Sequence, residues 1–117
     1  VLLVFWATWC PVCELEIPYM EQVYQEFKDG GVVVIAIDSG ESSSLTRSFR
    51  SGHAMSYYVM ADPDYKVTNI YRTDSYPRNF FIHPSGRIYT VVKGGMNYSL
   101  ISQYVRVMLA GHVPPTP

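Results

Sequence analysis

The chain has 117 residues, which is enough for one domain with a sizeable hydrophobic core. Its formal net charge is −1 and it has no long basic or acidic run, so a nucleic-acid partner is not supported. Hydrophobic residues make up 48% of the chain in short runs, none of which reaches the roughly 18 residues that a membrane-spanning helix requires.

The first predicted elements surround the two cysteines. An apolar run over residues 1–6 predicts a buried strand, and residues 11–28 show helical periodicity. Pro11 suits the first position of a helix, whereas Pro18 removes one backbone hydrogen bond and predicts a kink. The expected buried face of this helix comprises apolar residues three or four positions apart: Val12, Leu15, Tyr19, Val23 and Phe27.

Strands and helices are predicted to alternate along the rest of the chain. The further elements are a strand over 32–37, a polar helix over 42–50, a weaker strand over 57–60, a helix over 62–71, a hairpin of strands over 80–83 and 88–92, and a helix from Asn97 to Gly111. This order predicts an α/β fold with a central mixed sheet flanked by helices. We expect residues 1–112 to form the domain and residues 113–117 to be a proline-rich tail.

Cys10 and Cys13 stand two residues apart, where the first strand gives way to the helix. The first amides of a helix lack partners and the helix dipole is positive there, so a thiolate at Cys10 is stabilised and its pKa falls below about 8.5. Cys13, one turn further on, can attack a mixed disulfide formed on Cys10. The pair therefore predicts a dithiol–disulfide exchange centre, with Cys10 as the exposed nucleophile and Cys13 as the resolving thiol.

Two other interpretations of the cysteine pair stay open, a structural disulfide and half of a metal site. A zinc site needs two further ligands, and His53, His83 and His112 are isolated from one another with no His-x₃₋₅-His spacing. We therefore expect no metal and no cofactor other than the redox-active Cys10–Cys13 disulfide.

The segment Phe-Trp-Ala-Thr-Trp-Cys-Pro-Val-Cys over residues 5–13 resembles the active-site segment of the thioredoxin superfamily. The closest resemblance is to its TlpA/ResA-like branch of extracytoplasmic thiol–disulfide oxidoreductases. Pro18 lies where the superfamily kinks its active-site helix, residues 76–82 resemble the segment that carries its cis-proline, and residues 83–87 resemble the hairpin turn after it. The resemblance spans residues 1 to about 110 and implies a thioredoxin-like fold.

The resemblance also implies an additional strand–helix unit between the cysteine helix and the proline segment. The 63 residues between Cys13 and Pro77 are more than a minimal thioredoxin fold needs, and this length fits the TlpA/ResA-like branch. Members usually carry a strand or hairpin before the position of Val1, preceded by a signal or membrane anchor. We therefore expect this chain to be part of a longer protein that meets the membrane only through such an anchor.

Substrate-binding residues follow from the same resemblance. Pro77 is expected to be cis and to lie against the cysteines, with the backbone of Tyr76 pairing with a substrate strand. Trp9 and Pro11 flank Cys10 and are expected to contact the substrate, Trp9 also shielding the cysteines. Two small hydroxyl residues often follow the proline in the family, whereas this chain has Arg78-Asn79, which leaves its substrate specificity open.

Glu16 is the third catalytic candidate. It lies three residues after Cys13 on the same face of the predicted helix. In ResA-like proteins a glutamate at this position is thought to serve proton transfer for the second cysteine, whereas many thioredoxins carry an acid at the position of Val4. The alternative is a solvated glutamate on the helix surface. Asp38, just after a predicted parallel strand, is either a site residue or a turn cap.

The resemblance implies a reductase of protein disulfides outside the bacterial cytoplasm, in the periplasm or at the outer face of the membrane, where a membrane or lipid anchor would hold it. It would receive electrons from an upstream membrane donor, and apocytochrome c is one candidate substrate. The direction of exchange depends on how strongly the Cys10 thiolate is stabilised.

Three other functions are alternatives to a disulfide reductase. A peroxiredoxin-type peroxidase needs Thr or Ser three residues before its nucleophile, where this chain has Ala7. A Sco-like copper-binding chaperone spaces its cysteines by three residues and adds a histidine ligand, whereas the spacing here is two. A redox-inert interaction domain stays open.

Overall fold

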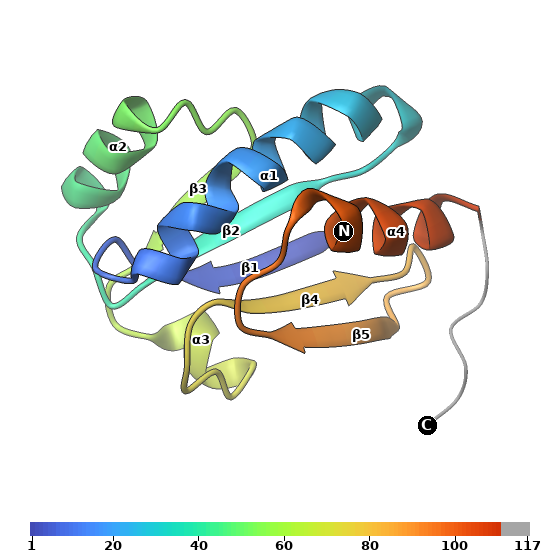
Figure 1. Ribbon diagram of the computed structural model, residues 1–117. Helices are drawn as coiled ribbons and strands as arrows, with labels where there is room; N and C mark the ends of the chain where they lie inside the picture. The colour runs from blue at the N-terminus through green and yellow to red at the C-terminus, as the bar shows by residue number, and fades with distance from the viewer. Residues whose placement is uncertain (111–117) are drawn as a thin grey trace.

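Strands and helices alternate along residues 1–110, the part of the chain that the structure, a computed structural model, describes. The elements are β1 (Leu2–Trp6), α1 (Pro11–Phe27), a 3₁₀ turn (Lys28–Gly30), β2 (Val34–Ser39), α2 (Ser43–Gly52), β3 (Tyr58–Asp62), α3 (Lys66–Ile70), β4 (Arg78–Ile82), β5 (Ile88–Lys93) and α4 (Tyr98–Leu109) (Figure 1). Two strand–helix pairs, β2–α2 and β3–α3, thus lie between the cysteine helix and Pro77.

The five strands form one mixed sheet in the order β3-β2-β1-β4-β5. β1 lies at its centre, parallel to β2 and antiparallel to β4, while β3 is parallel to β2 and β5 antiparallel to β4. The predicted mixed sheet, with a parallel part and an antiparallel hairpin, is therefore confirmed.

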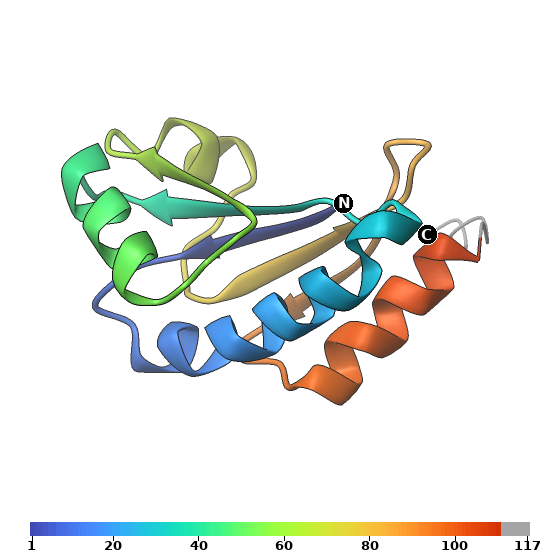
Figure 2. The ribbon, with the colours of Figure 1, turned by 90° about the horizontal axis from the view of Figure 1, so that it is seen from above.

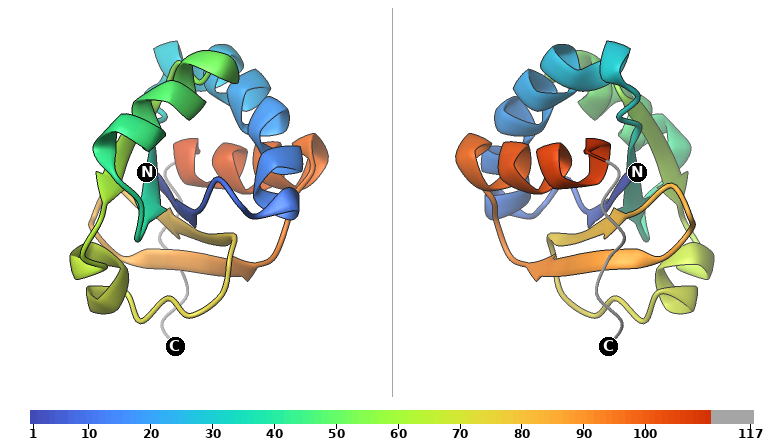
Figure 3. Two further views of the ribbon diagram at one scale, coloured as in Figure 1. Left: turned by 90° about the vertical axis from the view of Figure 1, so that its left-hand side faces the viewer. Right: turned by 90° about the vertical axis from the view of Figure 1, so that its right-hand side faces the viewer.

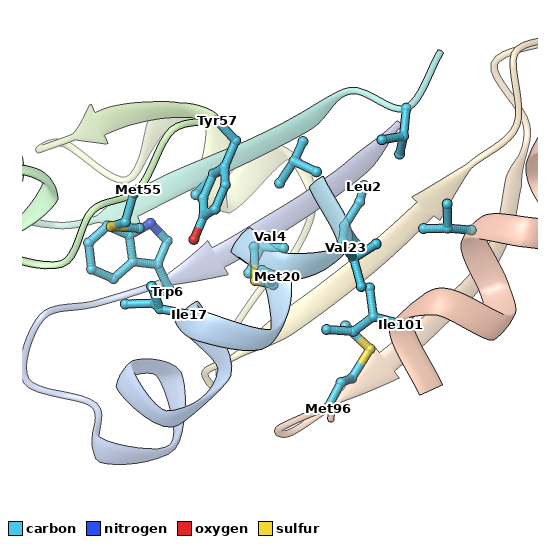
Figure 4. Packing of buried hydrophobic residues seen from close by; sticks show 14 of the residues in the cluster. Leu2, Val4, Trp6, Ile17, Met20, Val23, Met55, Tyr57, Met96 and Ile101 are labelled. Atoms are coloured by element: carbon cyan, nitrogen blue, oxygen red, sulfur yellow. The ribbon is translucent and has the colours of Figure 1, made fainter. Parts of the chain in front are cut away.

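Successive residues of β1 supply two hydrophobic cores, because neighbouring side chains of a strand point to opposite faces. Leu2, Val4 and Trp6 belong to the larger core on the face covered by α1 and α4 (Figure 4). Leu3 and Phe5 belong to a smaller core that includes side chains of α3 and the residue after it. Figure 3 shows α3 on the opposite side of the sheet from α1 and α4, and Figure 2 shows α1 and α4 side by side.

The prediction of the buried face of α1 was wrong. The face that is buried in the structure is shifted by about one residue toward the C-terminus. Val12, Leu15 and Tyr19 are exposed. The face that meets the sheet comprises Cys13, Glu16, Ile17, Met20 and Val23. The sequence offers apolar side chains on both faces, and the face that continues from Cys13 is the one that packs against the sheet.

The predicted helix over residues 62–71 is shorter than expected. Asp62 ends β3, and α3 begins only at Lys66, after Tyr65 in a left-handed conformation with φ 58°. The Asp62 carboxylate still acts on this helix, since it accepts hydrogen bonds from the backbone amides of Thr68 at 2.8 Å and Val67 at 3.3 Å. A cap-like role was thus expected correctly for Asp62, but at a larger separation in sequence.

Two other helix starts agree with the sequence. Ser42 caps α2 by accepting a hydrogen bond from the Leu45 amide at 3.2 Å, and Asn97 caps α4 by accepting one from the Leu100 amide at 2.9 Å. The predicted helix end at Gly111 and the predicted tail over residues 113–117 lie outside the described residues. Over the described part of the chain, the helices are too short or too polar to cross a bilayer.

The packing of α4 on the sheet gives a stability prediction. Ile101 is fully buried in the larger core, whereas Ile70 on α3 is mostly exposed. Ile101→Ala is expected to lower the free energy of unfolding by about 2–5 kcal/mol, because it removes buried methyl groups and leaves a cavity. Ile70→Ala, the matched control, should change it by about 0.5 kcal/mol or less. Equal losses in urea denaturation would contradict this assignment of the core.

Candidate active site

The turn between β1 and α1 places Cys10 at the end of the helix. Cys10 is the N-cap residue of α1, and its Sγ accepts a hydrogen bond from the backbone amide of Cys13 at 3.3 Å. Its own amide donates to the Ala7 carbonyl at 3.2 Å, which closes the turn. A sulfur therefore occupies the capping position that a serine or aspartate oxygen usually takes, where unpaired amides favour a thiolate.

Cys10 and Cys13 form a disulfide, with their Cα atoms 5.2 Å apart. Cys10 is only 5% exposed and Cys13 only 3%, so the expectation of an exposed Cys10 was wrong for this disulfide form. The physical reason is that the Cys10 sulfur faces the helix amide and the carbonyl oxygen of Tyr76, which lies 3.7 Å away.

The proline segment lies against the cysteines, as the resemblance implied. The Tyr76–Pro77 peptide bond is cis and Pro77 is buried. Trp9 packs edge-on against the Tyr76 ring with their centroids 5.9 Å apart, yet its side chain is 66% exposed. Pro11 is exposed at the start of α1. The structure thus brings Trp9, Tyr76 and Pro77 together around Cys10.

Arg78 and Asn79 follow this proline, and their side chains bind different parts of the site. The Arg78 guanidinium donates hydrogen bonds to the Asp74 carboxylate at 2.7 Å and the Ser75 hydroxyl at 2.8 Å, so it holds the loop before Pro77. Asn79 is fully buried, and its Nδ2 donates to Glu16 Oε1 at 3.3 Å. The same amide group also donates to the Gly94 carbonyl at 3.0 Å, which fixes its orientation.

Glu16 is buried, with 2% of its surface exposed, so the alternative of a solvated helix-surface glutamate was wrong. Its Oε1 accepts hydrogen bonds from the Met96 amide at 2.9 Å and from Asn79. Burial raises the pKa of Glu16 to about 8, and these two hydrogen bonds oppose the rise because they stabilise the carboxylate. Glu16 and Cys13 line the same small cavity in the core.

A second carboxylate, Glu41, holds the turn in front of Cys10. It accepts hydrogen bonds from the Thr8 amide and the Thr8 hydroxyl, both at 2.7 Å. Asp38 is fully buried in β2 and accepts a hydrogen bond from the Thr46 hydroxyl at 2.8 Å. Burial, and then the neighbouring Glu41, raise the pKa of Asp38, so Asp38 is a buried acid behind the turn rather than a turn cap.

A family model and several relatives match this chain. The AhpC/TSA family model matches residues 1–91. The chain belongs to the AhpC/TSA family. Its relatives include the thiol–disulfide oxidoreductase ResA of Bacillus subtilis, 36% identical over 111 residues, which cover 95% of this chain and 62% of the relative. The ResA of Oceanobacillus iheyensis is 31% identical over 105 residues, or 90% of this chain and 55% of the relative.

Solved structures of related proteins have the same fold. A thiol:disulfide interchange protein of the thioredoxin family from Chlorobium tepidum superposes with a TM-score of 0.81 at 26% identity, covering 92% of this chain and 78% of the other. A secreted Mycobacterium tuberculosis disulfide oxidoreductase homologous to E. coli DsbE gives 0.82 at 25% identity, covering 91% and 79%. The fold of this AhpC/TSA member is therefore thioredoxin-like, and the chain spans roughly three-fifths of the length of its curated relatives.

Several residues of the site were not predicted from the sequence. Glu41 follows a glycine in a polar segment, and nothing in that segment points to Thr8, which lies 33 positions away. In the sequence, Asn79 stands out only as a departure from the family. The Met96 amide has no sequence signal, because any residue except proline has a backbone N–H. Within residues 1–110, no three His, Cys, Asp or Glu side chains converge where a metal ion could bind.

The buried Glu16 gives a prediction for the pH dependence of stability. In the disulfide form its pKa is about 8, against an ordinary value of 4.5, so between these pH values the unfolded chain has lost a proton that the folded chain keeps. The free energy of unfolding should therefore fall as the pH rises through this window. Denaturation from pH 5 to pH 9 should show Glu16→Gln losing about 2–4 kcal/mol less than the parent.

Asp64→Asn is the control, because the Asp64 side chain is exposed and has no hydrogen-bond or ion-pair partner among the described residues. This variant should follow the parent curve over the same pH range. An identical pH dependence of Glu16→Gln and the parent would mean that Glu16 is not a neutral buried acid.

Proposed function

We propose that residues 1–112 form the catalytic domain of a thiol–disulfide oxidoreductase that reduces disulfides of protein substrates outside the bacterial cytoplasm. The observation that carries this proposal is the Cys10–Cys13 disulfide at the N-terminus of α1, with the Tyr76–Pro77 segment beside it. The names of the matched relatives support the same chemistry. The catalytic residues are Cys10, Cys13 and Glu16, and the substrate-binding residues are Trp9, Pro11, Tyr76 and Pro77.

The reaction begins from the reduced pair. The Cys10 thiolate, stabilised by the helix amides, attacks one sulfur of a substrate disulfide, forms a mixed disulfide and releases one substrate thiolate. Cys13 then loses its proton and attacks the Cys10 sulfur, which restores the Cys10–Cys13 disulfide and releases the second substrate thiolate. Two electrons pass from the dithiol to the substrate, and an upstream membrane donor must reduce the disulfide again before the next turnover.

Glu16 is the proposed acceptor of the Cys13 proton. Cys13 is buried away from the helix end, and burial disfavours its thiolate, so a base must accept the proton as Cys13 attacks. A carboxyl group with a pKa of about 8 is a stronger base than an ordinary carboxylate, and its pKa lies near physiological pH, where a general base is most efficient. The product of this transfer is a disulfide beside a neutral Glu16, which is the protonation state that burial favours near neutral pH.

Exposed apolar side chains around Cys10 suit polypeptide substrates. Trp9, Val12 and Leu15 are exposed next to the cysteine pair, where the end of β1 meets α1. These side chains offer contacts to apolar residues of an unfolded chain, and the Tyr76 backbone offers hydrogen bonds to an extended one. Apocytochrome c is one candidate substrate of this class.

The contacts of Thr8 favour a thiol–disulfide oxidoreductase over a peroxiredoxin-type peroxidase. A peroxidase needs a hydroxyl group near its reactive cysteine, and the position that would carry it is Ala7. The neighbouring Thr8 hydroxyl already donates its hydrogen to Glu41. For a copper-binding module of the Sco type, a copper titration of the reduced protein is the discriminating measurement, because tight binding of one ion per chain would favour it.

The first functional prediction concerns the two cysteines. Cys13→Ser should accumulate mixed disulfides with substrate proteins through Cys10, whereas Cys10→Ser should not, because only Cys10 makes the first attack. In the reduced parent, Cys10 should also alkylate faster than Cys13. Mass spectrometry of trapped adducts reads out both results. Equal trapping by the two variants, or faster alkylation of Cys13, would reverse the assigned roles.

The second functional prediction concerns the resolving step. Dithiobis(nitrobenzoate) releases one coloured thiol when Cys10 reacts and a second when Cys13 resolves the mixed disulfide. Glu16→Gln should slow the second release about tenfold near neutral pH and leave the first nearly unchanged, because the variant keeps the shape but not the base. Stopped-flow traces from pH 5 to pH 9 test this, and superimposable second phases would remove Glu16 from the mechanism.

A further inference from the structure

A small cavity lies in the core behind the cysteine pair. Its volume, measured for the centre of a water molecule, is about 10 Å³. It is lined by Val4, Trp6, Cys13, Glu16, Ile17, Met20, Ala36, Met55 and Tyr57. The cavity therefore contacts both the resolving cysteine and the proposed base of the resolving step, on the side of the pair away from the substrate-binding residues.

Two of the side chains that line this cavity each have a polar atom without a hydrogen-bond partner among the described residues. These atoms are Trp6 Nε1 and Tyr57 Oη. Trp6 is 3% exposed and Tyr57 only 1%, so neither atom reaches bulk solvent. Figure 4 shows the indole nitrogen and the hydroxyl pointing into the space between the two rings. An unsatisfied buried polar group costs roughly 1–3 kcal/mol, and native proteins usually provide a partner, often a water molecule.

The cavity has the size and the lining that a buried water molecule requires. Its volume is close to the lower bound for one water, and buried waters typically make two to four hydrogen bonds. The Trp6 N–H can only donate, the Tyr57 hydroxyl can donate and accept, and the Glu16 carboxyl supplies acceptor oxygens. The hydrogen bonds from Asn79 and from the Met96 amide both reach Glu16 Oε1.

We propose that this cavity holds one water molecule, bound by Trp6 Nε1, Tyr57 Oη and the Glu16 carboxyl, and that Tyr57 positions this water to carry the Cys13 proton to Glu16. The inference deepens the proposed disulfide-reductase function and rests on it. Neither Trp6 nor Tyr57 touches the substrate, so both are positioning residues in this scheme.

The proton balance of the step is simple. As Cys13 attacks the Cys10 sulfur of the mixed disulfide, its S–H bond breaks and the proton passes to the water, which gives one of its own protons to the Glu16 carboxylate. The Cys13–Cys10 bond forms, the bond between Cys10 and the substrate sulfur breaks, and the substrate leaves as a thiolate. The water is regenerated, and the proton remains on Glu16 until the pair is reduced again.

Tyr57 acts in this scheme as a neutral hydrogen-bond donor. Burial, and then the negative charges of Glu21 and Glu16, raise its pKa above the ordinary value of a tyrosine, so the hydroxyl keeps its proton. The groups that face Glu16 come from four places. Cys13 from α1 and Tyr57 from the segment before β3 line the cavity with it, while the Asn79 side chain from β4 and the Met96 amide before α4 bind it. During the step Cys13 gives up its proton and becomes a neutral disulfide sulfur, and Glu16 changes from a carboxylate to a neutral carboxyl.

Tyr57→Phe is the decisive variant, since it removes one hydroxyl and keeps the ring. In the dithiobis(nitrobenzoate) assay, the second release should slow roughly three- to tenfold, less than for loss of the base itself. Its pH profile should also shift to higher pH, because the Glu16 carboxylate loses a hydrogen-bonded water that stabilises its charge. The first release, which reports Cys10, should stay within about twofold of the parent.

Tyr24→Phe is the matched control, because the Tyr24 ring packs edge-on against Tyr57 with centroids 6.0 Å apart and Tyr24 does not line the cavity. It should leave both releases and the pH profile unchanged. Equal slowing in the two tyrosine variants would mean an effect of packing and would overturn the proposal, as would a Tyr57→Phe profile that coincides with the parent.

A high-resolution crystal structure of the disulfide form of the parent tests the water without any variant. We expect an ordered water within hydrogen-bonding distance of Trp6 Nε1, Tyr57 Oη and Glu16, and a dry cavity would overturn the proposal whatever the kinetics. Failure of the proposed function gives a different result, because the reduced parent would then not reduce the disulfides of a protein substrate, whatever its dithiobis(nitrobenzoate) traces. A parent that releases both thiols, beside an unaffected Tyr57→Phe, refutes only the role of Tyr57.

Discussion

The hydrogen bond from the Cys13 amide to the Cys10 sulfur places the reactive atom where α1 begins, and the rest of the site is arranged around it. β1 brings the chain to this point between β2 and β4, so the turn starts from the most constrained strand of the sheet. A serine or aspartate oxygen would cap the helix at least as well, but only a sulfur can also exchange disulfides. The same amides that cap the helix stabilise the thiolate, so helix initiation and thiol activation use one set of donors.

A competition between burial and hydrogen bonding governs Glu16. Burial raises the pKa of the carboxyl, whereas the hydrogen bonds from the Met96 amide and the Asn79 side chain favour its charged form and lower it. Burial wins, but the two donors keep the group able to titrate near neutral pH. Asn79 provides one of these N–H donors, so a residue that departs from the pattern of the resemblance contributes to the chemistry of the core.

Local signals predicted much of this fold. The order of the elements, the caps at Ser42 and Asn97, and the turn at the cysteines all follow from neighbouring residues, and the structure agrees with each of them. Helix α3 is an exception. Asp62-Pro63 predicts a helix start at this point, but Tyr65 adopts a left-handed conformation, so the helix begins only after it.

Orientation and distant contacts were not predictable in the same way. The periodicity of α1 allows more than one buried face, and the choice between them depends on the sheet that the helix packs against. For Glu16 the sequence suggested a role, but its burial depends on Asn79 and on the Met96 amide, which lie 63 and 80 positions away. Glu41 had no signal at all, since its partner Thr8 becomes a neighbour only when β2 lies alongside β1.

The contact between Glu41 and Thr8 also determines what an acid titration of this protein can report. Burial alone would raise the pKa of Glu41, but hydrogen bonds from Asp38 and from Thr8 outweigh it and leave the pKa below its ordinary value. The carboxylate therefore keeps both hydrogen bonds to Thr8 well below neutral pH, so the turn before Cys10 keeps its shape on the acid side of neutrality. A change in reactivity between pH 5 and pH 7 therefore belongs to the sulfur atoms and to Glu16 rather than to movement of the loop, whereas above pH 7 the Asp38 carboxyl, whose pKa is about 8, titrates behind the same turn.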